Sequence, residues 1–155
     1  MKGKAEIMSV LNELLANELT ALDQYLLHSK MCANWGYVRL ATKLHEESLD
    51  ELGHAGAIIN RILFLEGAPD LATRHALQIG DTVRTQLEND AKLEYDAIAS
   101  LNAGIAAART AGDNATEDLL TKILVAEEQG VDWLETQLEL IRQVGEQNYL
   151  AQQLH

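Results

Sequence analysis

The segment EGAPDLATRHALQIG, residues 66–80, interrupts a sequence that is otherwise patterned as long helices. It begins with EGAPD, residues 66–70, where a glycine precedes the single proline of the chain, a combination that ends helices. Residues 71–80 show no clear period and are interpreted as a connection. A connection of this length can run from one end of a helical bundle to the other. The segment therefore predicts two helical hairpins joined by a long crossover.

Four long helices and one short helix are predicted around this segment. The expected long helices span residues 5–34, from Gly36 to about 65, from Asp81 or Thr82 to about 110, and 116–144, with a short helix after Gly145. The chain, residues 1–155, is therefore interpreted as a single all-α domain. If the connection crosses the bundle, we expect the first and third helices to run parallel. An up-and-down bundle with short loops is the alternative, and it needs no such segment.

Composition and charge narrow the function classes. The formal net charge is −12, which argues against a nucleic-acid partner, because phosphate binding needs a basic surface, and is compatible with binding cations. Cys32 is the only cysteine, which excludes an intramolecular disulfide and fits a reducing compartment. No apolar run is long enough for a membrane span. We therefore expect a cytoplasmic protein that does not interact with membranes.

One glutamate interrupts the apolar stripe of each predicted long helix. These residues are Glu18, Glu51, Glu94 and Glu127. The same number of residues separates Glu18 from Glu51 as separates Glu94 from Glu127, and a predicted turn lies about midway in each pair. Residues equidistant from the turn of an antiparallel hairpin lie at the same height. All four carboxylates are therefore expected in one layer of the core.

His54 lies one helical turn after Glu51 on the same side of the helix. Burying a carboxylate without a positive partner costs at least several kcal/mol, and no Lys or Arg lies on these stripes near the layer. A pair of divalent metal ions would satisfy the carboxylates and the imidazole. A lone Glu-x-x-His pair is more typical of a solvated face. The prediction of a dinuclear metal site therefore depends on four glutamates in matched register.

Motifs along the whole chain resemble the bacterioferritin family. They are NEL (17–19), DQY (23–25), NWG (34–36), DE (50–51), HA (54–55), RILFLEG (61–67), EE (127–128), DWLE (132–135) and QNYL (147–150). The resemblance implies a ferritin-like four-helix bundle with a long crossover between helices 2 and 3 and a short C-terminal fifth helix. It also implies a shell of 24 subunits, built from two-fold dimers, that oxidises Fe(II) and stores the ferric mineral.

The resemblance further implies a di-iron ferroxidase site within each bundle. Carried over by position, its ligands are Glu18, Glu51, His54, Glu94 and Glu127. Tyr25 and Trp133 match aromatic residues near the family's site and would pass electrons, with ordinary core packing as an equally weighted alternative. The expected activity is a ferroxidase with iron bound at the di-iron site.

Two positions depart from the family pattern. The fourth helix carries Glu127-Glu128-Gln129-Gly130 where the family has Glu-x-x-His, so the second iron would lose its nitrogen ligand and bind more weakly. The family's haem-ligating methionine directly follows the residue that matches Glu51, and here that position is Leu52. Leucine has no donor atom, so we expect no haem in a homodimer.

Three further surface predictions concern partners and iron. A second apolar stripe predicts a two-fold dimer face. The alternative is a wider buried stripe within one subunit. The residues of this stripe are Leu15, Leu19, Leu22 and Leu26 on the first helix and Leu49, Leu52, Gly56 and Ile59 on the second. An acidic side of the second helix is expected to be solvated, with iron collection at a cavity wall as the alternative; it comprises Glu46, Glu47 and Asp50. Three histidines without partners in the sequence are expected at the surface: His28, His75 and His155.

Two functions of different classes follow. The first is an iron-storing ferroxidase subunit. The second is a structural shell subunit with weak or no ferroxidase activity, which would co-assemble with a second subunit that binds haem or carries the full ligand set. A ferritin-like DNA-protecting protein is disfavoured by the acidic charge. A di-iron oxygenase with an organic substrate is disfavoured because the resemblance covers the whole chain.

Overall fold

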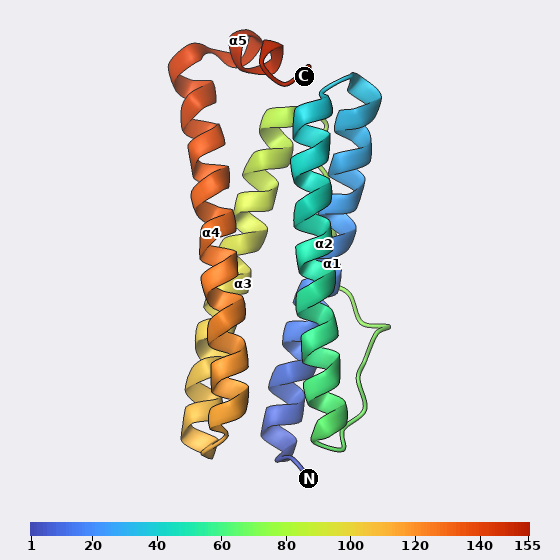
Figure 1. Cartoon of the computed structure of the whole chain (residues 1–155), viewed down its shortest axis with the longest axis vertical. Helices are drawn as coiled ribbons and strands as arrows, with labels where there is room; N and C mark the ends of the chain where they lie inside the picture. Colours follow the sequence, from blue (N-terminus) through green and yellow to red (C-terminus); the bar gives the residue numbers. More distant parts are fainter.

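The computed structural model describes residues 1–155 and contains five helices and no strand. The helices are α1 (Ala5–Trp35), α2 (Val38–Phe64), α3 (Val83–Ala111), α4 (Asn114–Val144) and α5 (Glu146–Ala151). The four long helices lie side by side along the long axis, and α5 covers the end of the bundle opposite the N-terminus (Figure 1). The predicted four-helix bundle with a long crossover and a short fifth helix is confirmed. None of the helices combines the length and the apolar character that a membrane span requires.

The crossover after α2 determines the direction of α3. It returns the chain to the end of the bundle where α1 finishes, so α3 starts there and runs back (Figure 1). Contacts between the two helices agree, because Tyr25 bonds Glu94 whereas Cys32, later in α1, bonds Gln86, earlier in α3. The first and third helices are therefore antiparallel. The expectation that they run parallel was wrong, because a crossover along the full length reverses the direction that a short loop would give.

Side chains of α1 hold the crossover in place. Four of them accept hydrogen bonds from its backbone N–H groups: Asn12 from Asp70, Thr20 from His75, Gln24 from Gln78 and His28 from Gly80, at 2.9–3.1 Å. The order of the partners rises along both segments. The crossover therefore follows α1 along its length, and four of its backbone donors find partners there without a sheet or helix of its own.

Local signals end and start the helices where the sequence predicts. Gly36 and Gly112 adopt φ values of 92° and 72°, in the left-handed region that favours glycine, and so end α1 and α3. Thr82 caps α3 by accepting a hydrogen bond from the backbone N–H of Thr85 at 3.1 Å. These ends set the register of the two hairpins, on which the height of the glutamates depends.

The core consists of two apolar clusters with a polar layer between them. One cluster fills the half near the N-terminus and contains Leu11, Leu15, Ile58, Ile62, Leu101 and Leu120. The other fills the half near α5 and contains Leu40, Leu44, Leu87, Leu134 and Ile141. The interrupting glutamates fall at the boundary between these clusters, and each is at most 3% exposed. The apolar halves therefore hold the carboxylates out of water from both sides.

Candidate metal centre

Four of the predicted site residues meet in the polar layer. Glu18 of α1, Glu51 and His54 of α2, and Glu127 of α4 each offer one ligand atom, and these atoms all lie within 4.8 Å of one another. The predicted glutamate stripes explain the meeting, because each hairpin places its two carboxylates at one height. Three carboxylates and one imidazole form a mixed oxygen and nitrogen donor set that suits a first-row transition metal.

His54 lies at the centre of this group. Its Nδ1 atom is 3.1 Å from Glu127 Oε1, 3.3 Å from Glu18 Oε2 and 3.5 Å from Glu51 Oε2. Burial alone would lower the pKa of His54, but its hydrogen bond with Glu127 and its close contacts with Glu18 and Glu51 outweigh burial and raise the pKa to about 12. In the metal-free protein His54 is therefore an imidazolium, the positive partner that the glutamates otherwise lack.

Two carboxylate oxygens of the group have no hydrogen-bond partner. They are Glu18 Oε2 and Glu51 Oε2, on side chains that are 3% and 2% exposed. Burial raises the pKa of Glu18, and burial together with the neighbouring Glu18 holds the pKa of Glu51 well above its usual range. Orphaned buried oxygens are rare in folded proteins. A cation between them would satisfy both, so this donor set fits a bound metal ion.

Glu94 lies beside the group rather than within it. It belongs to α3, is 1% exposed, and accepts a hydrogen bond of 2.6 Å from the hydroxyl of Tyr25. Burial and the adjacent Glu127 hold the pKa of Glu94 well above its usual range, against the lowering effect of Tyr25. Burial and the charge of Glu94 also raise the pKa of Tyr25. The phenol therefore stays protonated and fixes the orientation of the fourth carboxylate.

The sequence predicts that the acidic side of α2 is solvated, but the structure shows that one of its three residues is buried. Glu46 and Asp50 are exposed, but Glu47 is only 8% exposed and forms an ion pair with Lys43. The signal for its burial was present, because Glu47 precedes Glu51 by one helical turn and so shares its inward face. The prediction of a solvated face holds for two of the three residues and was wrong for Glu47.

His28 is completely buried, which corrects the prediction that it lies at the surface. Its Nε2 accepts the backbone N–H of Gly80, so its Nδ1 carries the proton and donates to Asp90 Oδ1 at 2.9 Å. Gln24 Nε2 donates to the same oxygen at 2.9 Å. The crossover covers this face of α1, and the sequence alone did not indicate which face it would cover. His75 and His155 are exposed, as predicted.

The remaining predicted residues do not belong to the group of four ligand residues. Trp133 is half-buried, with the Lys43 ammonium 5.3 Å from its ring centre. Leu52 is 53% exposed on the outside of α2. The second apolar stripe divides, because Leu15 and Leu19 are buried in the core whereas Leu26 is exposed. The dimer face that the sequence predicts is therefore narrower than the whole stripe.

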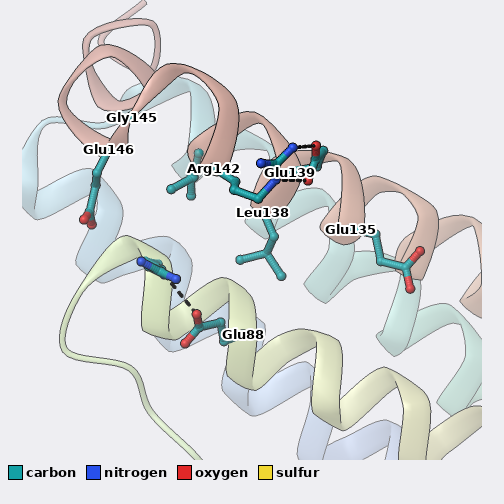
Figure 2. Close-up of a pocket in the computed structure, with 9 residues that line it drawn as sticks. Glu88, Glu135, Leu138, Glu139, Arg142, Gly145 and Glu146 are labelled. Atoms are coloured by element: carbon teal, nitrogen blue, oxygen red, sulfur yellow. Dashed lines mark hydrogen bonds and ion pairs between the residues drawn. The ribbon is translucent and has the colours of Figure 1, made fainter.

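A separate surface cavity of about 630 Å³ lies between the start of α3 and the end of α4. Figure 2 shows that charged side chains line it, and each arginine of the cavity pairs with a glutamate of its own helix. Arg84 bonds Glu88, and Arg142 bonds Glu139 in two contacts. Because both arginines of the cavity are already paired with glutamates, it offers no free cation to an anionic ligand. The buried carboxylate layer remains the candidate site.

Comparison with known proteins identifies the family. The family model described as Ferritin-like domain matches residues 8–144. Over 152 residues the chain is 45% identical to the bacterioferritin of Mycobacterium leprae and 46% identical to that of Mycobacterium tuberculosis, covering 98% of this chain and 96% of each relative. The chain belongs to the bacterioferritin family. It is also 43% identical to a bacterial ferritin of Synechocystis, with 99% of both chains covered. Membership in this family places the chain among iron-storage proteins.

Proposed function

We propose that this bacterioferritin subunit oxidises Fe(II) at a di-iron site within its bundle and delivers Fe(III) for storage. The observation that carries the proposal is the buried group of Glu18, Glu51, His54 and Glu127, whose ligand atoms lie within 4.8 Å of one another. Glu94 completes the set from α3. Iron is here the substrate, and dioxygen or hydrogen peroxide takes its electrons.

The protein's part in this reaction is electrostatic. The carboxylates stabilise the ferric product more than the ferrous substrate, because the attraction grows with the charge of the ion. The surrounding apolar clusters keep water from screening that attraction. His54 gives up its proton when an ion approaches and then offers a neutral nitrogen. Tyr25 holds Glu94 by its 2.6 Å hydrogen bond, so this carboxylate meets the ion already oriented.

Rapid mixing tests the proposal. Metal-free protein is mixed with Fe(II) and oxygen, and ferric absorbance is followed in the wild type, Glu18→Ala and His54→Ala. We expect a fast phase that saturates near two irons per subunit in the wild type and disappears in both variants. A fast phase that survives unchanged in the variants would place iron oxidation elsewhere on the protein.

The proposed assembly is a shell of 24 subunits built from two-fold dimers. Family membership supports a homo-oligomeric shell, and exposed leucines on the first hairpin support a dimer face. These include Leu26, Leu49 and Leu52, which are 38%, 52% and 53% exposed in the single chain. Covering such a face removes apolar surface from water. Because Leu52 offers no donor atom, this face would not ligate haem in a homodimer.

A second candidate function is supported by Gly130. This position has no side chain, so the imidazole of the family pattern is absent. If the second iron then binds too weakly for oxidation, the subunit would serve mainly to build the shell beside a fully liganded partner subunit. Native mass spectrometry of shells from the source organism distinguishes the candidates, because shells made of this chain alone would exclude an obligatory partner.

A further inference from the structure

A second carboxylate occupies the space next to the missing histidine. A Cβ atom built on Gly130 would lie 3.8 Å from Glu47 Oε2, and no other atom of a neighbouring helix would lie within 4 Å of it. A side chain at position 130 would therefore extend from a point beside this carboxylate. The absence of a side chain at Gly130 leaves that space to Glu47.

The register of the helices puts Glu47 next to the proposed di-iron layer. It lies on α2 one turn before Glu51, and Gly130 lies on α4 one turn after Glu127. Because α2 and α4 run in opposite directions, both steps lead toward the end covered by α5 (Figure 1). Glu47 and Gly130 thus face each other in the layer directly adjoining that of Glu51 and Glu127.

Glu47 is held there by one cation. Lys43 Nζ lies 2.5 Å from Glu47 Oε1, and the two side chains are 33% and 11% exposed. The Lys43 ammonium also lies over the ring of Trp133. The other carboxylate oxygen, Oε2, is the one nearest to Gly130. Lys43 is thus the counter-ion of an otherwise unpaired and nearly buried carboxylate.

We propose that Glu47 supplies a carboxylate oxygen to the second metal ion in place of the imidazole that Gly130 lacks, exchanging Lys43 for the ion. This inference rests on the proposed di-iron site. An anionic ligand replaces a neutral one, so the second position gains negative charge and favours the ferric product more strongly. The second metal ion then keeps the same number of protein ligands, with a carboxylate in place of the imidazole.

Anaerobic titration with Co(II) tests the inference through binding alone. Co(II) is not oxidised in the site, and its visible absorption reports both stoichiometry and coordination. We expect the wild type to bind two ions per subunit. Glu47→Gln should weaken the second equivalent by at least about 10-fold and leave the first unchanged. Glu46→Gln, which removes an exposed carboxylate next along the helix, is the matched control and should bind as the wild type does.

Two further variants separate ligation from an effect through the ion pair. Lys43→Gln removes the competing cation, so its second equivalent should be as tight as in the wild type or tighter. A loss in Lys43→Gln equal to that in Glu47→Gln would overturn the inference. Adding Gly130→His to Glu47→Gln should restore the second equivalent, because it returns a nitrogen donor to the same space.

The outcomes distinguish this inference from the proposed function. Two equivalents of unchanged affinity in Glu47→Gln would reject Glu47 as a ligand and leave the di-iron site standing. A single equivalent in both wild type and Glu47→Gln would also reject Glu47, since nothing then occupies the second position. No binding in the wild type would reject the di-iron site itself.

Discussion

Metal binding should stabilise the folded subunit, and the free energy gained should match the cost of the buried carboxylate oxygens that lack a hydrogen-bond partner. Glu18 Oε2 and Glu51 Oε2 have no hydrogen-bond partner in the metal-free protein. Leaving one buried polar atom unsatisfied costs about 1–3 kcal/mol, so the pair costs about 2–6 kcal/mol. A chain of 155 residues shifts its Tm by about 2–4 °C per kcal/mol. Saturation with a divalent ion should therefore raise the Tm by about 4–24 °C.

Scanning calorimetry under anaerobic conditions measures this shift. The metal-free protein is compared with the same protein in excess Co(II), with the assembly state checked in both. Glu51→Gln keeps the shape of the side chain but removes its charge and one ligand, so it should lose most of the shift. Glu46→Gln changes an exposed carboxylate and should keep the full shift. A shift of the same size in Glu51→Gln would refute the reasoning, because the ion would then stabilise the protein from another place.

Three further predictions concern protons, the buried network and haem. Burial holds the pKa values of Glu51 and Glu94 above their usual range, so an ion must displace protons from them. Co(II) affinity should consequently fall as the pH is lowered, and calorimetry in buffers of different ionisation enthalpy should detect proton release; binding without protons would contradict the assignment. Asp90→Ala should lower the free energy of unfolding by about 2–4 kcal/mol, because it strips His28 and a second buried donor of their acceptor, and a urea titration showing less than about 1 kcal/mol would contradict this. Leu52→Met should confer a Soret band at up to one haem per two subunits that the wild type lacks, and an unchanged spectrum in the variant would count against the dimer face.

The helices and the polar layer could be predicted because both depend on periodicity. Steps of three and four residues define the buried face of each helix, and a glutamate on that face remains visible as an interruption. Its distance from the turn then fixes its height. Glu18, Glu51 and Glu127 lie close together although the direction of the second hairpin was predicted wrongly, because the glutamates of both hairpins lie near mid-length, where heights measured from opposite ends of the bundle coincide.

The residues that were missed depend on how separate elements pack. His28 continues the buried face of α1, but only the crossover that covers it shows why a polar side chain can lie there. Glu47 shares the inward face of Glu51, and its position depends on the space that Gly130 leaves across the bundle. Neither neighbour is close in sequence. The periodicity of the sequence identifies which side of a helix faces inward. How many residues beside that side are also buried depends on the helix packed against it.

The hydrogen bonds between α1 and the crossover restrict how many residues the crossover can contain. Surface connections usually tolerate inserted or deleted residues. Here Thr20, Gln24 and His28 accept from the backbone N–H groups of His75, Gln78 and Gly80, and the last of these lies two residues before the Thr82 cap of α3. One extra residue within residues 75–80 would shift every later donor past its acceptor and rotate the start of α3. The number of residues in the crossover thus determines which side of α3 faces inward. Its length should therefore be as constrained as the core, although it contains neither helix nor strand.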